Sequence, residues 1–466
     1  MSRYGPDMSG PDRATTPGAR ASASANPVDP APPRTPPRAA TGALVLDLVR
    51  TAGTVSRVEL AERSGLTAAT ITHVVRELMA EGLVHEVGRR TGTVGSPRRL
   101  LRLAADAWYA VGVQLDRCAS SVVVTDFAGR RVASTGVRGV GRGAPGDTLP
   151  VLARHTDLLL AGAGIPRDRV LGVGLVTHGP QDRAAGVVLT GQPTPAWREY
   201  PLTRTLADLL DLPVLLENDA TAAAVGEQWV GSLDVDTFGV LYMATGIGGG
   251  VIAGAEVYRG GTANPVEVGH IPVDPAGPRC ACGNRGCVEV LAGPGAVVGA
   301  ALAVPGLGAR LGLDGGADAQ LADFQRVARA AVAGDAAALA LVDASARRLG
   351  TAAVTLMNLF DLDTVVLAGP AFAVAGALYV ERAQEVVDAG ALARLLRPVH
   401  VRLSRDVRVS AAVGGALVVL RSPLGRPGRA DRAGGADRAG RDDRSDRAAG
   451  AAASGAPLDL TALAPA

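Results

Sequence analysis

The chain of 466 residues contains no lysine, because all 47 of its basic side chains are arginine. We attribute this bias to genome composition rather than to mechanism. The 45 acidic residues leave a net charge of +2, so the overall charge does not require a nucleic-acid partner. Any argument for DNA binding therefore depends on where the arginines are concentrated.

Aromatic residues and long apolar runs are also scarce. Aromatics make up 3% of the sequence against 47% for all hydrophobic residues, so leucine, valine and alanine must fill the core. Glycine, proline or a charged residue interrupts every apolar run before it is long enough to cross a bilayer. We also find no secretory leader, and we therefore expect a cytoplasmic protein with no membrane partner.

Cysteine is rare as well, yet three of the four cysteines lie within eight residues. Cys280, Cys282 and Cys287 follow His270, and this set can form a tetrahedral site with Zn²⁺ as a structural cofactor. Glycines at 283 and 286 permit the turns that bring the last thiolate back to the same point. Four protein ligands leave no open position for water, so the site would be structural. The odd number of cysteines disfavours a disulfide, and their clustering disfavours ordinary thiols.

Composition divides the chain into four segments. Residues 1–40 and 423–466 are low-complexity stretches without periodicity, and both are predicted to be disordered. Residues 41–105 have the pattern of three helices and a hairpin, which predicts a winged helix-turn-helix domain. Residues 106–422 alternate apolar strands with Ala- and Leu-rich helices, which predicts an α/β fold. The five candidate strands are 121–126, 170–176, 213–217, 238–244 and 364–368. The first of them is expected in a hairpin rather than in a crossover.

Local signals define the first two helices of the small domain. Leu44, Leu48 and Val49 give the first helix an apolar face. Ser56 and Glu59 form a capping box that opens the second helix, because each side chain can bond the other residue's backbone amide. After the third helix, an Arg- and Gly-rich hairpin between two strands would form the wing.

The third helix, capped by Thr67 and ended by Gly82, is the predicted recognition helix, whose exposed face would enter the major groove. Its inner face is expected to consist of Ile71, Val74, Val75 and Leu78. His73 and Arg76 are the candidate base readers, while threonines of the helix and arginines of the wing would contact phosphate. The predicted DNA-binding residues are Thr67, Thr70, Thr72, His73, Arg76, Arg89, Arg90 and Arg98.

Winged folds also mediate contacts between proteins. The arginine cluster of the wing favours operator DNA as the partner. Because a symmetric pair usually reads such a site, we expect a homodimer on a near-palindrome, with a tetramer as the alternative.

The larger domain resembles the ROK family of repressors, open reading frames and kinases. The run Glu267–Glu289 matches the family signature E-x-G-H…C-x-C-G-x-x-G-C-x-E at every named position. The resemblance covers about residues 41–422, and further landmarks fall at 172–180, 216–220, 245–250 and 367–370. It implies a two-lobed actin-like domain of the sugar kinase and Hsp70-type ATPase fold. In that fold the sugar lies between the lobes, and a zinc loop, here 267–289, orders part of its site.

The resemblance also implies which residues bind the ligands. The sugar contacts would be Asn218, Asp219, Glu267, His270 and Glu289. Carboxylates suit this role because each accepts two hydroxyl hydrogen bonds, and His270 would serve zinc through one ring nitrogen and sugar through the other. If the protein is a kinase, Asp219 would be its catalytic base. The second phosphate loop would include Thr245, Gly246, Gly248 and Gly249.

The first phosphate loop departs from the family pattern. The kinases carry D-x-G-G-T, whereas Gln114, Asp116, Arg117 and Cys118 occupy the four defined positions here. Glutamine is a poor substitute for a carboxylate near Mg²⁺, and bulky side chains would obstruct the phosphates. We therefore expect ATP turnover to be absent or very slow, although Asp116 offers one route by which the metal role could be recovered.

The leading hypothesis is a sugar-responsive transcriptional regulator, most simply a repressor, in which a sugar or sugar derivative changes how the winged domains meet operator DNA. The alternative is an active, glucokinase-like sugar kinase with ATP and Mg²⁺ as cofactors and an accessory DNA-binding domain. A third reading is a constitutive DNA-binding protein whose cleft has lost its ligand. The sequence leaves open which sugar binds and whether it releases or promotes DNA binding.

Overall fold

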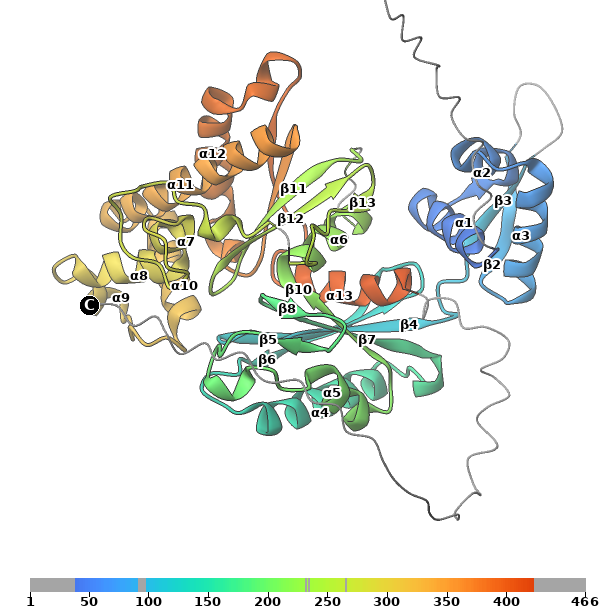
Figure 1. Cartoon of the computed structure of the whole chain (residues 1–466), viewed down its shortest axis with the longest axis horizontal. Helices are drawn as coiled ribbons and strands as arrows, with labels where there is room; N and C mark the ends of the chain where they lie inside the picture. Colours follow the sequence, from blue (N-terminus) through green and yellow to red (C-terminus); the bar gives the residue numbers. More distant parts are fainter. Residues whose placement is uncertain (1–37, 91–97, 231–232, 234, 265, 423–466) are drawn as a thin grey trace, which may run out of the picture.

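A computed structural model describes residues 38–90, 98–230, 233, 235–264 and 266–422. It consists of a small N-terminal domain beside a larger body of two lobes (Figure 1). The segments predicted to be disordered lie outside the described residues, except for residues 38–40, where the first helix begins. In the described part of the chain, no helix has both the length and the apolar character needed to span a bilayer.

The N-terminal domain contains three helices and a three-stranded sheet. The predicted capping box is confirmed, because the side chain of Ser56 accepts a bond from the Glu59 amide and the Glu59 carboxylate accepts one from the Ser56 amide. The side chain of Thr67 likewise caps the third helix. The elements are α1 (Arg38–Ala52), β1 (Val55–Ser56), α2 (Arg57–Ser64), α3 (Ala68–Ala80), β2 (Val84–Arg90) and β3 (Arg98–Leu103).

The inner faces of two helices test the sequence pattern. In α3 all four predicted residues of the inner face are buried. In α1 the prediction was wrong for Leu44, which is 39% exposed, whereas Val45 and Leu46 are buried beside Val49. Val45 and Val49 are four residues apart, so they share a face of the helix that Leu44 does not.

The two lobes repeat one sheet topology. Each sheet begins with three antiparallel strands and adds two parallel strands beside the first of them, giving the orders β10-β7-β4-β5-β6 and β13-β12-β11-β14-β15. This repetition confirms the two-lobed actin-like fold. The strands of the first sheet are β4 (Tyr109–Gln114), β5 (Ala119–Asp126), β6 (Arg131–Arg138), β7 (Val170–Thr177) and β10 (Val214–Asn218). Those of the second are β11 (Phe238–Met243), β12 (Ile247–Ala253), β13 (Glu256–Val257), β14 (Thr364–Ala368) and β15 (His400–Leu403).

All five predicted strands are present, with ends within two residues of the prediction. The five candidate strands did not include β4, although it is apolar, nor the two-residue β13, and the sequence analysis also missed β6, β12 and β15. In β6 most residues are at least partly exposed, three of the seven residues of β12 are glycine, and β15 has only four residues. None of the three therefore has the apolar run on which the prediction relied.

Helices cover the outer faces of both sheets (Figure 1). The first lobe carries α4 (Pro145–Gly162) and α5 (Leu202–Leu210), together with a short ribbon of β8 (Gln181–Asp182) and β9 (Val187–Val188). The second lobe carries α7 (Val288–Ala292), α8 (Pro294–Ala303), α9 (Leu307–Leu311), α10 (Gln320–Val332), α11 (Ala336–Phe360) and α12 (Phe372–Gly390). The remaining helices, α6 (Asp219–Val230) and α13 (Ser410–Arg421), lie between the two sheets.

The packing of α6 against α13 depends on glycine. A Cβ at Gly414 of α13 would overlap the carbonyl oxygen of Ala222 in α6, and a Cβ at Gly112 of β4 would overlap the carbonyl oxygen of Ala412 in α13. Only glycine permits such close approaches of two backbones. α13 is therefore fixed against both the first sheet and α6.

The substitution Gly414→Ala should destabilise the protein, because the added methyl group must push α6 and α13 apart. Overpacking of this kind costs about 1–3 kcal/mol or more. The matched control is Gly299→Ala in α8, where no atom lies within 4 Å of the added Cβ. That change should stabilise the helix by about 0.5–1 kcal/mol. Thermal unfolding of both variants checks the prediction, and an unchanged melting temperature for Gly414→Ala would contradict it.

Candidate functional site

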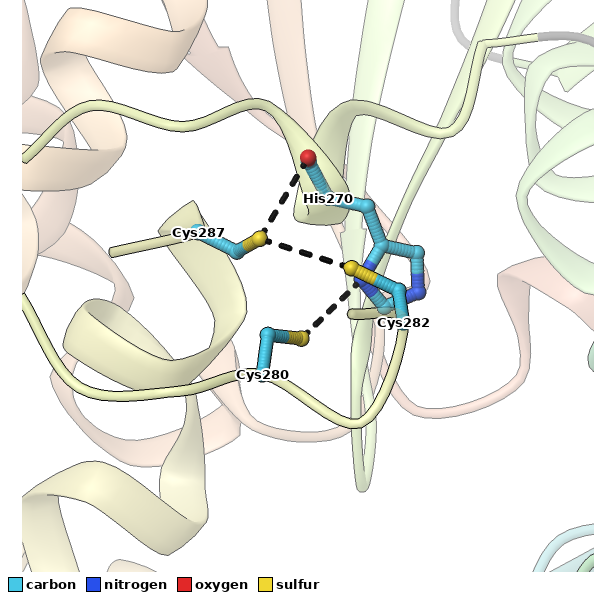
Figure 2. Close-up of side chains that lie close together, drawn as sticks. All are labelled: His270, Cys280, Cys282 and Cys287. Carbon is cyan, nitrogen blue, oxygen red and sulfur yellow. Dashed lines mark hydrogen bonds between the residues drawn. The ribbon is translucent and has the colours of Figure 1, made fainter. Parts of the chain in front are cut away.

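The four predicted metal ligands meet at one point. The ligand atoms of His270, Cys280, Cys282 and Cys287 all lie within 4.8 Å of one another. Sγ of Cys280 is 3.5 Å from Nδ1 of His270, and Sγ of Cys282 is 3.6 Å from Sγ of Cys287 (Figure 2). The imidazole presents Nδ1 to the sulfur atoms, while its second ring nitrogen lies on the far side of the ring from Cys280.

The loop around this cluster is built for tight turns. The predicted positive φ angles at Gly283 and Gly286 are confirmed, at 97° and 60°. A Cβ at Gly286 would also overlap the carbonyl oxygen of Asp274, so the chain can cross itself there only at a glycine. This crossing places Cys287 directly before α7.

The donor set fits a metal cation. Three sulfur atoms and one imidazole nitrogen are the ligand types of closed, four-coordinate sites. Burial raises the pKa of the Cys287 thiol, so its thiolate needs a cation beside it. At the exposed Cys282 a hydrogen bond from the backbone of Asn284 lowers the pKa. The cluster can therefore hold a metal through its own side chains.

Glu289 joins the metal loop to the second sheet. Its Oε2 accepts a hydrogen bond from the backbone amide of Ile247 at 2.9 Å, at the turn between β11 and β12. A Cβ at Gly246 would collide with the same oxygen. A side chain at position 246 would therefore displace the Glu289 carboxylate, so this glycine has a role that does not depend on a phosphate.

Two more of the predicted sugar contacts meet around Gly179, just after β7. A Cβ at Gly179 would lie 3.4 Å from Nδ2 of Asn218 and 3.5 Å from Oε1 of Glu267. It would also lie 3.4 Å from Oδ1 of Asn264, which the sequence analysis missed. Asn264 bonds both backbone groups of Gln181, at 2.7 and 2.9 Å, so it fixes this loop. A lone asparagine outside any motif gave no signal in the sequence.

Asp219 lies at the start of α6, beside Asn218. Burial, together with the charges of Asp116 and Glu267, raises its pKa to about 7. Glu267 is affected in the same way, because burial and the charge of Glu289 raise its pKa while His270 opposes them. Three of the five predicted sugar residues, Asp219, Glu267 and Glu289, therefore lie close enough for the charge of Glu267 to act on Asp219 and that of Glu289 on Glu267.

The first phosphate hairpin, between β4 and β5, is filled by its own side chains. Gln114 is buried and donates a hydrogen bond to the hydroxyl of Tyr242 in the second lobe. Asp116 accepts bonds from the amide of Cys118 at 2.8 Å and from the hydroxyl of Thr245 at 2.7 Å. These contacts tie the hairpin of the first lobe to the equivalent hairpin of the second.

The glycines of the second hairpin pack against α6. A Cβ at Gly248 would lie 3.0 Å from Cβ of Ala220, and a Cβ at Gly250 would lie 2.5 Å from its carbonyl oxygen. At Gly249 the added atom would meet Val266 instead. The glycine run from 248 to 250 therefore has a packing role that is independent of nucleotide.

The predicted DNA-binding residues lie on one face of α3 and on the wing. Thr67, Thr72, His73 and Arg76 are exposed, and Thr70 is partly exposed. Several are already engaged, because Oγ1 of Thr67 caps the helix and Oγ1 of Thr72 donates to the carbonyl oxygen of its own helix at residue 68. Nε2 of His73 lies 3.3 Å from Glu77. This leaves Arg76 as the long basic side chain on that face.

The base of the wing is fixed by a glutamate. Glu86 pairs with Arg99 at 2.6 Å and with Arg57 at 3.1 Å. The hydrogen bond from Arg99 is the largest cause that lowers the pKa of Glu86, and the bond from Arg57 adds to it. Arg89 and Arg98 are exposed on the two strands of the wing. The side chain of Arg90 and the wing tip, residues 91–97, lie outside the described residues. The sequence analysis missed Glu86 and Arg57 because the three partners come from separate elements.

Comparisons with known proteins agree with this arrangement. The sequence profile of the ROK family matches residues 159–422, and that of winged helix-turn-helix DNA-binding domains matches residues 44–85. The xylose repressor of Bacillus subtilis is 31% identical over 239 residues, covering 51% of this chain and 62% of the repressor. A ROK family transcriptional regulator homologous to the E. coli MLC protein has a crystal structure with a TM-score of 0.65 and 24% identity, over 82% of this chain and 96% of that one. A ROK family glucokinase from Streptomyces griseus, solved with glucose and AMPPNP, has a TM-score of 0.58 and 28% identity, over 67% of this chain and 100% of the glucokinase.

Replacing Cys282 by serine should release the metal. We expect about one equivalent per chain in the wild type and the loss of most of it in the variant, because one thiolate of four is removed. Cys118→Ser is the matched control, since Cys118 is the one cysteine outside the cluster. Elemental analysis of gel-filtered protein measures both. A wild type without bound metal, or a Cys282→Ser variant that keeps it, would contradict the assignment of these four ligands.

Proposed function

We propose that the protein is a transcriptional repressor controlled by an unphosphorylated sugar. The premise is that the chain belongs to the ROK family and carries a winged helix-turn-helix domain. The observation that carries this proposal is the filled first phosphate hairpin. The side-chain amide of Gln114 bonds Tyr242, and the carboxylate of Asp116 bonds Thr245 and the amide of Cys118. These polar groups are therefore already engaged with the second lobe and with the hairpin itself. With this hairpin engaged, the site would bind a sugar but no nucleotide.

The DNA-binding role rests on the exposed face of α3 and on the wing. Arg76 would read base edges in the major groove, and Arg89 and Arg98 would contact phosphates of the same site. Thr67 and Thr70, at the N-terminus of α3, would approach the backbone of the duplex. We propose that a homodimer places two such surfaces on a near-palindromic operator.

The sugar would bind where Asn218, Asp219, Glu267 and Glu289 surround His270. The metal of the adjacent loop is proposed to be zinc, held by His270 and the three cysteines. With four protein ligands it would supply no catalysis and would act as a structural tie. Its role is supported by Glu289, which follows the last cysteine by two residues and bonds the amide of Ile247.

The charge of the cleft favours a sugar without a phosphate group. The charges of Asp116 and Glu267 raise the pKa of Asp219, and the charge of Glu289 raises that of Glu267, which indicates a concentration of negative charge. Arg183 and Arg259 both pair with the buried carboxylate of Glu217, the residue before Asn218 in β10. A phosphate dianion would therefore meet like charge, whereas neutral hydroxyls find hydrogen-bond acceptors.

One observation favours the second candidate function, an active sugar kinase. Asp219 lies where the kinases of this family hold their catalytic base, and a pKa of about 7 suits a general base at neutral pH. The filled hairpin opposes this candidate, because phosphoryl transfer depends on metal and positioning rather than on the base alone.

Sugar should change the affinity for DNA by roughly 5- to 150-fold, the usual range of coupling between two sites. The probe is a duplex that the full chain selects from a random-sequence pool. Its dissociation constant is measured with D-xylose, D-glucose or N-acetyl-D-glucosamine, and with the phosphate ester of each. We expect at least one free sugar to act, and its ester to bind about tenfold more weakly or worse.

Two variants sharpen this test. Glu267→Gln should weaken sugar binding because it removes an anionic acceptor, whereas Asp208→Asn, an exposed acid on α5, should not. If the ester binds as tightly as the free sugar, the assigned effector class is wrong. If no sugar or ester alters DNA affinity, the regulator proposal itself fails.

Nucleotide turnover separates the two candidates. With ATP, Mg²⁺ and the same sugars, ADP release should stay far below typical kinase rates of about 1–100 s⁻¹. A coupled spectrophotometric assay measures it, with buffer lacking sugar as the blank. Sugar-dependent turnover within that range would show that the hairpin does not prevent catalysis, and the protein would then be a kinase.

A further inference from the structure

Arg50 of α1 is buried where the N-terminal domain meets the first lobe. Its side chain is 1% exposed, and its Nε donates to the carbonyl oxygen of Phe127, in the turn between β5 and β6, at 3.0 Å. The guanidinium lies 4.9 Å from the ring centroid of Phe127 and 4.5 Å from that of Trp229 in α6. Asp47, one turn earlier in α1, accepts a bond from Nη1 at 2.9 Å.

The turn that receives Arg50 is held from several sides. The amide of Phe127 donates to the carbonyl oxygen of Ala105, in the segment that follows the wing, at 2.8 Å. The indole of Trp229 donates to the carbonyl oxygen of Ala128 at 3.1 Å. A Cβ at Gly129 would collide with Trp229 of α6 and with Leu417 of α13, so the turn packs closely against both of these helices.

The end of α13 adds a second connection to α1 (Figure 1). Arg421 donates to Oε1 of Gln228 in α6 at 2.8 Å, and it lies 4.0 Å from the carboxylate of Asp47. Buried side chains of the N-terminal domain, of the Phe127 turn and of α13 form one apolar cluster. The contact between the domains is therefore a packed interface with a defined geometry.

The other end of α6 lies in the proposed sugar site. The helix has 12 residues and is about 18 Å long, beginning at Asp219 and carrying Trp229 next to its last residue. Asn218 caps it through a bond from the amide of Thr221 to Oδ1 at 3.0 Å. One straight helix therefore touches the sugar site at its first turn and the Arg50 contact at its last.

We propose that α6 transmits sugar binding to the DNA-binding domain through the contact of Arg50 with Trp229 and the Phe127 turn. This proposal rests on the proposed function and specifies how the same site is regulated. Sugar hydroxyls bound to Asn218 and Asp219 shift the start of α6, and the helix moves as a rigid body. Trp229 moves with it and changes how Arg50 holds α1. Arg50 is in this sense a positioning residue.

The energetics of the ion pair fit a geometric role. Burial lowers the pKa of Arg50 to about 10 and raises that of Asp47, so loss of hydration outweighs the attraction between them. A buried pair of this kind adds little net stability, whereas the planar guanidinium fork and the two aromatic rings define one orientation. Lysine would keep the charge but lose that fork.

The test measures coupling rather than stability. For the full chain we determine the ratio of the dissociation constants for the selected duplex with and without the active sugar from the panel above. The variants are Arg50→Lys, Trp229→Leu and Asp47→Asn, the last of which changes one side-chain atom at a residue that is 37% exposed. Arg130→Ala is the control, since Arg130 lies next to the same turn with its side chain 73% exposed.

The ratio should fall to within about twofold of one in the three variants and stay at the wild-type value in the control. Sugar affinity in the absence of DNA should change little, because the cleft is intact. If the contact is merely structural, each substitution will weaken DNA binding equally with and without sugar, and the ratio will stay at the wild-type value. That result would overturn the proposal. If Arg50→Lys or Trp229→Leu fails to fold, Asp47→Asn decides. If no sugar changes the affinity of the wild type for the duplex, the ratio is one for every sugar. The proposed function would then be wrong, and this inference would be wrong with it.

Discussion

The close approach of α13 to its neighbours is the constraint on which the rest of the structure depends. Gly414 lets α13 lie against α6, and Gly112 lets it lie against β4, in each case with backbone touching backbone. Because side chains do not separate these elements, the centre of the molecule behaves as a compact block. The proposed sugar site lies at the start of α6, and the N-terminal domain docks where α6 and α13 end. A ligand and an operator would therefore act on the two ends of one packed unit.

Under the proposed function, a fold shared with kinases serves regulation. In the first hairpin, Gln114 and Asp116 are hydrogen-bonded to Tyr242 and Thr245 of the second lobe. In the second hairpin, the glycines are needed by Glu289 and by α6. Both hairpins thus keep their backbone shape for reasons of packing. In the proposed regulator, the binding energy of the sugar would bias a conformational equilibrium, with no phosphoryl transfer to follow.

Sequence reasoning succeeded where the partners are close along the chain. The capping box of Ser56 and Glu59 spans three residues, and the four metal ligands span 18, so spacing alone placed them together. It failed where partners are far apart. The bond between Glu289 and Ile247 spans 42 residues, that between Arg50 and Phe127 spans 77, and that between Gln114 and Tyr242 spans 128. Such contacts depend on how whole elements pack, and the error at Leu44 has the same origin, because the face that α1 buries is chosen by its neighbours.

The central claim is that the cleft and the DNA-binding domain are coupled through α6. The most direct measurement is hydrogen–deuterium exchange with and without the active sugar, followed by mass spectrometry of the full chain. The account predicts altered protection in the cleft loops, along residues 219–230, and in α1 around residue 50. If sugar binds and the change in exchange is confined to the loops at 178–181 and 264–289, the coupling described here does not exist.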